Sequence, residues 1–476
     1  MSALRTALAL SCAALALAGC GGGSDSSPVE TPTQLAAPEN FTVGSFAFFS
    51  WKATPEATRY ELFTDPDGPG PQPEARMGDA EGFTYSSFNQ QFNGSLTTGR
   101  YRYADFINAT YRLRACNTTG CGAFTAAQVF DIAKSISYEF PTGRSPLKTS
   151  VGNTSLESLS RDGLTLAVAL DNLYIFARSS TAHPWQQQAM FSSRATRLVL
   201  SADGNTLAVS GFFNADAPPV QVYQRSNATW SLQTTVDATQ TPPACTQPCK
   251  VIADNTALSA DGNVLAVTGR SGSAGSDTNA VFTYLRTGTA WAPQSYLAPA
   301  ATSVGSAMAL SGDGRTLAVN GGAFTRTQFT TPPYLYVYVQ SPEGAWSEQA
   351  RLPAGIMNFL DIAASRFSTV KLSSDGNTLA VEANHLPGNQ PAEFNIGTGD
   401  LTCGSTEPWN TAPVPAGSYS NAAWHIAVFA RDGSANWRRQ AVMARSGVQW
   451  ALANDGNALF YGGSLFTRSS GTWACP

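Results

Sequence analysis

Leu200-Ser-Ala-Asp-Gly-Asn-Thr-Leu-Ala-Val209 is the clearest of six close copies of one ten-residue stretch. The other copies begin at Leu159, Leu258, Leu310, Leu372 and, in a more diverged form, Leu452. Each copy is typical of a β-hairpin, because an apolar strand end, an Asp-Gly turn and a second apolar strand follow one another. Glycine adopts the positive φ that such turns need, and the Asp side chain can hydrogen-bond to the turn backbone. Six copies of one hairpin predict a repeat architecture.

Each copy continues into a second half with its own pattern. An aromatic-rich strand is followed by Arg or Gln, a short polar turn and a tryptophan. The tryptophans at this repeat position are Trp185, Trp230, Trp291, Trp346, Trp437 and Trp473. Their shared position indicates a packing role rather than six separate binding sites. Four antiparallel strands per repeat make one blade of a β-propeller. The repeats predict six blades and leave a seventh open.

The three repeat motifs together resemble those of a known group of propellers. L-S-x-D-G-N-T-L-A-V, V-Y-V-Y-x-R and W-x-x-Q-A are similar to the repeats of bacterial FG-GAP-type β-propeller proteins, which are distantly similar to the integrin α-chain head. The Asp-Gly turn also resembles the S-P-D-G-K turn of other periplasmic propellers, so the subfamily stays open. The resemblance implies the fold alone, because propellers host many activities. We place the propeller domain at residues 133–476.

The turn aspartates are the residues through which this family would bind calcium. Calcium-binding FG-GAP loops resemble D-x-D-x-D-G-x-x-D, whereas the turn here is only S-A-D-G-N-T-L, with Leu207 at the closing acidic position. Such a turn offers too few oxygen ligands for calcium, which takes six or more. We therefore expect structural turns, no metal and no cofactor, with calcium as the alternative. The turn residues are Asp162, Asp203, Asp261, Asp313, Asp375 and Asp455.

Residues 1–20 have the pattern of a lipoprotein signal peptide. Arg5 precedes a short apolar run, and Leu17-Ala-Gly-Cys20 resembles the bacterial lipobox. The run is too short to span a bilayer, and an ordinary secretory signal is the alternative. The resemblance implies that Cys20 becomes the lipidated N-terminus, with the membrane as partner. Gly21, rather than Asp, after the cysteine implies passage to the outer membrane of a bacterial cell envelope, and the leaflet stays open.

A tether and a separate domain follow the signal. Residues 21–36 are rich in Gly, Ser and Pro, which predicts a flexible linker. Residues 37–132 lack the repeat, and alternating strands predict a β-sandwich that resembles a fibronectin type III module. The resemblance implies that Trp51 is the core tryptophan, Tyr60 an inward-facing residue and Tyr111 the corner tyrosine. The predicted fold is therefore all-β, with an N-terminal sandwich and a six-bladed propeller.

Cysteine usage indicates an exported protein with disulfides. Apart from Cys12 in the signal and Cys20 at the lipid, six cysteines remain. Cys116 and Cys121 can close one small loop, Cys245 and Cys249 can close another, and Cys403 and Cys475 are left for each other. Six cysteines allow fifteen pairings, so local spacing only favours this one. No metal site is expected from them, because no histidine stands near either short pair in the sequence.

Composition and motifs exclude several classes of function. The net charge is −4, with 13% charged residues and scattered Lys and Arg. Nucleic acid is therefore not expected as a partner, since its binding needs a basic face. Neither Gly-x-Ser-x-Gly nor a Gly-rich phosphate loop is present, and His183, His385 and His425 share no motif with a nucleophile. An acid pair drawn from different loops stays open, so whether the protein is an enzyme stays uncertain.

The longest variable loop carries the candidate ligand-binding residues. Residues 384–420 lengthen one loop on the face opposite the Asp-Gly turns, and binding residues usually lie on variable loops above a rigid scaffold. Phe394 and Trp409 lie in this insertion and Trp424 follows it, so they could offer flat surfaces to a ligand. A Cys403–Cys475 disulfide would hold the insertion over this face. The alternative is that the tryptophans fill a small core of the insertion itself.

We therefore predict an exported, membrane-anchored lipoprotein that acts as a binding or adhesion module toward a glycan or protein ligand. A carbohydrate-active or other hydrolytic propeller enzyme is the alternative, and a scaffold in envelope assembly is the third hypothesis. A closed propeller must hide the edges of its first and last blades. We predict that Ser135-Ile-Ser-Tyr-Glu-Phe140 does so by completing the last blade as its outer strand.

Overall fold

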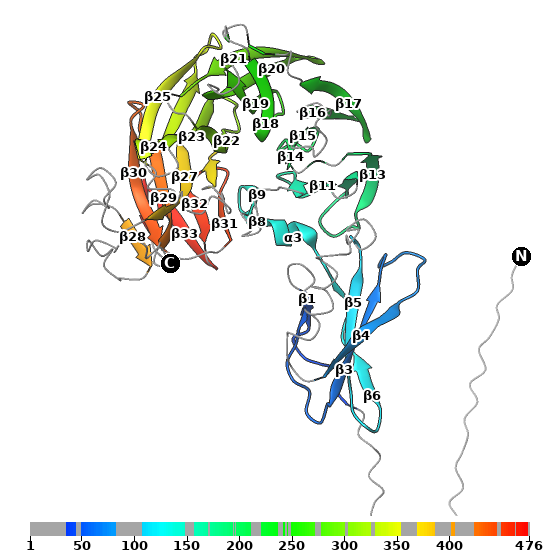
Figure 1. Cartoon of the computed structure of the whole chain (residues 1–476). Coiled ribbons are helices and arrows are strands. Elements are labelled where there is room, and N and C mark those ends of the chain that lie inside the picture. The colour runs from blue at the N-terminus through cyan, green and yellow to red at the C-terminus, as the bar shows by residue number, and fades with distance from the viewer. Residues whose placement is uncertain are drawn as a thin grey trace, which may run out of the picture.

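The computed structural model shows a β-sandwich and a β-propeller joined by the short helix α3 (Ile132–Ile136) (Figure 1). It describes residues 35–43, 49–81, 107–147, 157–169, 172–193, 195, 197–210, 220–236, 241–242, 245, 249–271, 278–299, 303–324, 329–353, 369–385, 401–404, 423–444, 449–461 and 463–474. Every element of these residues except α3 is a strand, which confirms the all-β prediction. Within them, no helix has the length and apolar character needed to cross a membrane.

The sandwich has a small sheet and a large one. β1 (Thr42–Val43) pairs with β2 (Phe49–Ser50), and the large sheet has the order β4-β3-β5-β6 with β7 also paired to β5. Its strands are β3 (Arg59–Asp65), β4 (Ala75–Glu81), β5 (Thr110–Cys116), β6 (Cys121–Phe124) and β7 (Gln128–Val129). The alternation in β5 shows why it forms. Tyr111, Leu113 and Ala115 are buried, whereas the residues between them are partly exposed.

The aromatic residues expected in the sandwich core lie in it. Tyr60 is 1% exposed, and its hydroxyl accepts a hydrogen bond from the backbone N–H of Thr54 at 2.9 Å. The ring of Trp51 packs against Tyr60 with centroids 5.2 Å apart, and Tyr111 is buried in the same core. Leu35, which the sequence places in the linker, is also buried there. The sandwich therefore includes the end of the predicted linker.

The propeller consists of six four-stranded antiparallel meanders, one for each repeat, in the described part of the chain. Blades one to three comprise β10 (Glu157–Leu159), β11 (Thr165–Ala169), β12 (Leu173–Ala177) and β13 (Gln186–Phe191); β14 (Arg197–Leu200), β15 (Thr206–Ser210), β16 (Val220–Ser226) and β17 (Thr229–Val236); β18 (Cys249–Leu258), β19 (Val264–Ser271), β20 (Thr278–Thr287) and β21 (Ala290–Leu297). Blades four to six comprise β22 (Ser303–Leu310), β23 (Thr316–Phe324), β24 (Phe329–Gln340) and β25 (Trp346–Pro353); β26 (Val370–Leu372), β27 (Thr378–His385), β29 (Ala423–Arg431) and β30 (Trp437–Ala444); β31 (Trp450–Leu452), β32 (Ala458–Tyr461), β33 (Ser464–Ser469) and β34 (Thr472–Ala474). The first strand of each blade lies nearest the centre of the ring (Figure 1).

Five of the six Asp-Gly turns are held by a serine two residues before the aspartate. In blade three, Ser259 Oγ donates to Asp261 Oδ1 at 2.6 Å and accepts from the N–H of Val264 at 2.9 Å. Gly262 has a φ of 67°, and a Cβ added there would lie 2.3 Å from Oγ1 of Thr206 in the preceding blade. Glycine is therefore required both by the turn and by the close approach of two blades. Asp162, Asp203, Asp313 and Asp375 accept the same serine hydrogen bond, and Asp455, which has alanine in place of that serine, accepts from the N–H of Asn457.

A ring of backbone hydrogen bonds joins the inner strands beside these turns. The donors and acceptors are Arg161 N and Ala202 O, Ala202 N and Ala260 O, Ala260 N and Gly312 O, Asp313 N and Ser374 O, and Ser374 N and Asn454 O, at 2.7–3.0 Å. The hairpin of β8 (Ser137–Phe140) and β9 (Gly143–Pro146) occupies the place between blades six and one. Arg144 N donates to Arg161 O at 2.9 Å, and Asn454 Nδ2 lies 3.3 Å from Thr142 O. The hairpin thus completes the ring.

This closure corrects the predicted role of residues 135–140. β8 pairs with β9 and not with β34, the outer strand of blade six. The reason is apolar packing, because Tyr138 stacks on Phe460 at 4.0 Å and Phe140 packs with Ala451 and Ala453 on the inner part of that blade. The segment does bring the two ends of the propeller together, but as half of an inner hairpin.

Neighbouring blades are also joined at their outer strands through the W-x-x-Q motif. The indole Nε1 atoms of Trp230, Trp291, Trp346 and Trp437 donate to Oε1 of Gln188, Gln233, Gln294 and Gln349 in the preceding blade, at 3.2, 2.8, 3.2 and 2.9 Å. An arginine at the end of the third strand adds a second link. Arg225 Nη1 donates to Thr165 Oγ1 of the preceding blade at 3.0 Å. The repeated tryptophan therefore has the packing role that its position predicts.

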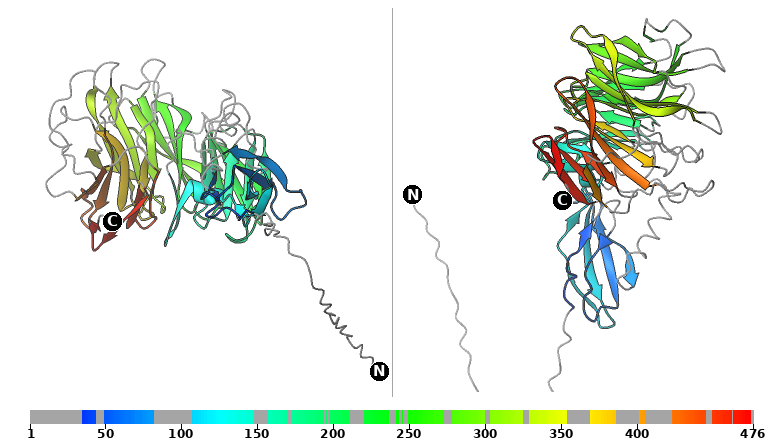
Figure 2. Two further views of the ribbon diagram at one scale, coloured as in Figure 1. Left: turned by 90° about the horizontal axis from the view of Figure 1, so that it is seen from below. Right: turned by 90° about the vertical axis from the view of Figure 1, so that its left-hand side faces the viewer.

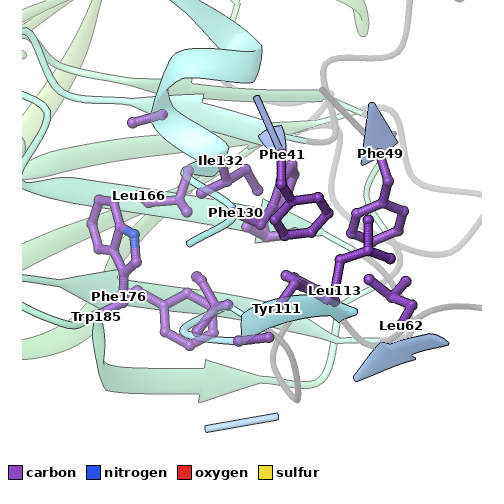
Figure 3. Packing of buried hydrophobic residues seen from close by; sticks show 14 of the residues in the cluster. Phe41, Phe49, Leu62, Tyr111, Leu113, Phe130, Ile132, Leu166, Phe176 and Trp185 are labelled. Carbon is purple, nitrogen blue, oxygen red and sulfur yellow. The ribbon is translucent and has the colours of Figure 1, made fainter. Parts of the chain in front are cut away.

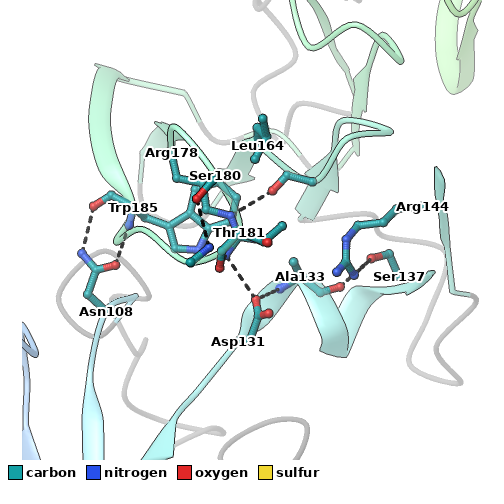
Figure 4. A network of polar contacts seen from close by, with 12 residues as sticks. Asn108, Asp131, Ala133, Ser137, Arg144, Leu164, Arg178, Ser180, Thr181 and Trp185 are labelled. Carbon is teal, nitrogen blue, oxygen red and sulfur yellow. Dashed lines mark hydrogen bonds and ion pairs between the residues drawn. The ribbon is translucent and has the colours of Figure 1, made fainter.

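Blade one follows no other blade in the chain, and at its tryptophan the sandwich makes the contacts that a preceding blade makes elsewhere. Asn108 Nδ2 donates to the carbonyl of Trp185 at 2.8 Å, and Asn108 Oδ1 accepts from the N–H of Trp185 at 2.7 Å (Figure 4). The guanidinium of Arg178 lies 4.2 Å from the Trp185 ring centroid and 3.7 Å from Oδ1 of Asp131. Burial lowers the pKa of Arg178, and the charge of Asp131 opposes that shift. The residues that join blades elsewhere here join a blade to a different domain.

Apolar side chains make the same junction continuous. Phe130 and Ile132, which follow the sandwich, pack in one cluster with Leu166, Phe176 and Trp185 of blade one and with the sandwich core (Figure 3). In Figures 1 and 2 the sandwich extends outward from the rim of the propeller beside the first blade. A shared core of this kind positions the sandwich relative to the ring.

Two of the three expected disulfides lie within the described residues. Cys116 bonds to Cys121 and Cys245 bonds to Cys249, with Cα atoms 3.9 and 6.3 Å apart. Cys475 lies outside the described residues, so the third pairing stays a prediction. The backbone of Cys403 lies in β28 (Leu401–Gly404), which runs parallel to β30 and adds an edge strand to blade five.

Candidate functional site

The inner strands of all six blades and the β8–β9 hairpin enclose a cavity of about 480 Å³ at the centre of the propeller, here called the channel. Its volume lies within the range of about 300–1,000 Å³ that is usual for small-molecule sites. Arg161 of blade one spans the end that carries the Asp-Gly turns, because its Nη2 donates to Oγ of Ser374 in blade five at 2.9 Å. A side chain therefore crosses this end of the channel.

The channel wall carries four cations and one carboxylate among the described residues. The cations are Arg144, Arg161, Arg197 and Lys371, and the carboxylate is Glu157. Three of the cations have partners within the protein. Arg144 Nη2 lies 2.6 Å from Glu139 Oε2, Arg161 bonds to Ser374, and Lys371 Nζ donates to the carbonyl of Pro146 and lies 5.1 Å from the ring centroid of Trp450. The excess of cations makes the channel suited to an anion.

Arg197 differs from the other three cations. It is the first residue of β14 and lies three positions before Leu200, at the end of the channel away from the Arg161–Ser374 bridge. Its guanidinium forms no hydrogen bond or ion pair with any described residue. Burial lowers the pKa of Arg197, and the charge of Asp254 in blade three partly opposes this. A guanidinium stays charged in proteins, so Arg197 brings a positive charge with five donors to the channel, and no described residue is in contact with it as a counter-ion.

Glu157 is the carboxylate of the channel and begins β10 of blade one. Burial raises the pKa of its carboxyl group above the ordinary value, with no other cause contributing. The neighbouring strands are in register through Ser158, whose Oγ accepts from the N–H of Leu200 at 2.9 Å. No ion pair joins Glu157 to Arg197 in the described part of the chain. The two groups therefore stand on adjacent inner strands of the channel without pairing with each other.

The described residues offer little support for a catalytic or metal site outside the channel. Ser180 Oγ lies 2.7 Å from His183 Nδ1, but both residues are exposed in a turn of blade one, and no described carboxylate bonds to His183. Glu61, Cys116 and Cys121 form the group of closely spaced metal-ligating residue types. Both cysteines are in a disulfide, and Glu61 Oε2 lies 2.6 Å from Arg114 Nη2. These atoms are already engaged.

The ligand-binding residues expected from the sequence cannot be placed in this channel. Phe394 and Trp409 lie outside the described residues, as do Cys20 and most of the variable loops. Trp424 is located by its backbone alone, which is paired with Asn384 in blade five. Binding through the insertion therefore stays a prediction.

The sequence reasoning missed the channel residues because it looked at variable loops. Arg197, Lys371 and Glu157 stand one to three positions before the repeat leucine, where the other repeats carry mainly Ala, Val, Leu, Ser, Thr or Asn. An alignment of the repeats upstream of the motif would have shown these charges as departures from a neutral pattern. Inner strands have few polar partners, so a charge there is the signal that points to a site.

The chain matches no protein-family model and no curated protein sequence. Solved structures with a similar arrangement include a protein from Lactobacillus plantarum (12% identity, TM-score 0.38, 77% of this chain and 90% of that chain). The periplasmic gluconolactonase of Pseudomonas aeruginosa gives 14% identity, a TM-score of 0.38 and coverage of 87% of this chain and 94% of that chain. TolB from Acinetobacter baumannii gives 10% identity, a TM-score of 0.30 and coverage of 81% of this chain and 65% of that chain. Similarities at this level assign neither an activity nor a ligand to this chain.

Proposed function

We propose that this protein is an exported, lipid-anchored binding protein that holds a small ligand in the channel of its propeller. The observation that supports this most is the cavity of about 480 Å³, whose wall is contributed by every blade and by the β8–β9 hairpin. Convergence of many elements on one cavity with a few charged groups is typical of binding sites. This places the proposed site in the channel rather than on the variable loops.

The lipid anchor is supported by Leu17-Ala-Gly-Cys20 and by the Gly- and Ser-rich linker after it. Cys20→Ser should leave an unprocessed precursor without added acyl mass, as measured by intact-mass spectrometry of the membrane fraction. Cys12→Ser is the matched control, because it removes a cysteine of the same signal and should leave processing unchanged. A mature protein cleaved elsewhere, with an unmodified N-terminus, would contradict the anchor.

Blocking the channel tests the binding proposal. Val199 lines the cavity from β14, so Val199→Trp should fill it and abolish retention of soluble cell-wall glycan fragments by the purified full chain. Leu232→Trp is the control, because Leu232 is 48% exposed on the outer strand of blade two. Circular dichroism should show that both variants fold. Equal retention by the folded Val199→Trp variant would place the site elsewhere.

A hydrolytic enzyme is the second candidate, and the raised pKa of Glu157 in the cavity favours it. A carboxyl group whose raised pKa keeps it protonated to a higher pH than usual can act as a general acid. The same incubation separates the two functions if both retention and release of new reducing ends are assayed. Binding without product supports the first function, whereas product release that Glu157→Gln abolishes would establish the second.

A further inference from the structure

The charges of the channel also indicate which chemical class of ligand it takes. Three of its four cations have hydrogen-bond or ion-pair partners within the protein, and Arg197 alone among them forms no hydrogen bond or ion pair with a described residue. We infer that Arg197 binds the carboxylate of a small hydroxycarboxylate ligand, such as a sugar acid, an inference that rests on the proposed function. The guanidinium matches a planar carboxylate through two parallel hydrogen bonds.

The surrounding charges favour a single carboxylate over a dianion. Glu157 stands on the adjacent inner strand, and Asp254 is the charged group whose field reaches Arg197. The negative charge of Asp254 would repel a second negative charge on the ligand. Arg161 lies at the opposite end of the channel and is bonded to Ser374, so it does not add to the charge around Arg197. One guanidinium without a protein partner, within the field of one carboxylate, therefore suits a monoanion better than phosphate or sulfate.

The remaining groups of the wall suit ligand hydroxyls. Glu157 forms no hydrogen bond with a described residue, and Thr369 adds a hydroxyl group at the same level as Arg197, three positions before the repeat leucine. Carboxyl and hydroxyl groups can accept hydrogen bonds from sugar hydroxyls and donate hydrogen bonds to them. A ligand with one carboxylate and several hydroxyls would satisfy both the free guanidinium and these groups.

Calorimetric titration of the full chain tests this assignment with matched probes. Glucuronate, galacturonate and lactate supply the carboxylate, and glucose, galactose and glycerol supply hydroxyls alone. A charge-assisted hydrogen bond contributes enough that the acids should bind about tenfold more tightly than the neutral probes. Arg197→Gln should abolish this preference, and Arg197→Lys should retain part of it because the charge remains. Arg315→Gln is the control, since Arg315 is exposed on the turn of blade four.

The outcomes separate this inference from the proposed function. No binding by any of the three carboxylates, or an unchanged preference in folded Arg197→Gln, would overturn the carboxylate assignment. If glycan fragments were still retained and Val199→Trp still blocked them, the channel would remain the binding site with another ligand class. If phosphate or sulfate bound more tightly than the three acids, the argument from the charge of Asp254 would be wrong.

Discussion

The indole Nε1 of Trp230 donates a hydrogen bond to Oε1 of Gln188 at 3.2 Å, which joins the outer strand of blade two to that of blade one. The same pair recurs between the next three neighbouring blades. Each tryptophan thus satisfies its polar atom with a residue that belongs to the preceding repeat. A repeat protein gains much of its stability from such nearest-neighbour interfaces.

Gln188→Leu should destabilise the protein by about 1–3 kcal/mol, because it leaves the N–H of a largely buried indole without an acceptor. Trp230 is only 5% exposed, so water does not readily replace the glutamine. Urea unfolding followed by tryptophan fluorescence measures the change. Gln187→Leu is the matched control, since Gln187 is the exposed neighbour on the same strand. Equal stability of the two variants would contradict a stabilising role for the Trp–Gln hydrogen bonds between blades.

Between blades five and six, the same change from glutamine to leucine should not destabilise the protein. Gln440 Oε1 and Trp473 Nε1 hold the equivalent positions, but both atoms are buried and form no hydrogen bond in the described structure. Replacing an unsatisfied polar group by an apolar one of similar size is nearly neutral or stabilising. Gln440→Leu should therefore leave the urea midpoint unchanged or raise it. A loss as large as that of Gln188→Leu would show that Gln440 and Trp473 do bond in solution.

The fold could be predicted because short local sequence patterns specify its repeat. Asp261, Gly262 and the flanking apolar residues specify one hairpin without reference to the rest of the chain, and recurrence of the tryptophan specifies the blade. The closure could not be predicted in the same way. Whether Phe140 packs on an inner or an outer strand depends on which part of blade six is left uncovered, and this is a property of the assembled ring.

The candidate site was not predictable from loop lengths. Arg197 and Lys371 are single charges within strands, and a strand with one charge is ordinary until the ring places several such residues around one cavity. The contact between the sandwich and blade one was not predictable either. Asn108 stands 77 residues from Trp185 in the chain, and no local pattern connects them.

Asn108→Ala should weaken the junction between the sandwich and blade one. The change removes one hydrogen bond to the carbonyl and one from the N–H of Trp185, so we expect a loss of about 1–3 kcal/mol. Faster hydrogen exchange at the Trp185 amide and separate unfolding transitions of the two domains are the measurements. Asn117→Ala is the control, because Asn117 bonds only within its own exposed turn. An unaltered Trp185 exchange rate would show that the apolar cluster alone holds the junction.

The stability of the protein should depend on pH through Glu157. Because burial raises the folded-state pKa of this carboxyl, the native state binds more protons than the unfolded state between the ordinary and the raised pKa. Stability contributed by the neutral carboxyl is therefore present below the ordinary pKa and is lost as pH rises through the raised one. Glu157→Gln, which mimics the neutral form, should have the same free energy of unfolding as the wild type at about pH 4 and a higher one at about pH 7, as measured by urea unfolding.

Glu343→Gln is a control of opposite sign, since a hydrogen bond from Ser341 lowers the pKa of Glu343. A wild type that is more stable than Glu157→Gln at about pH 7 would mean that the ionised carboxylate has a partner in the channel.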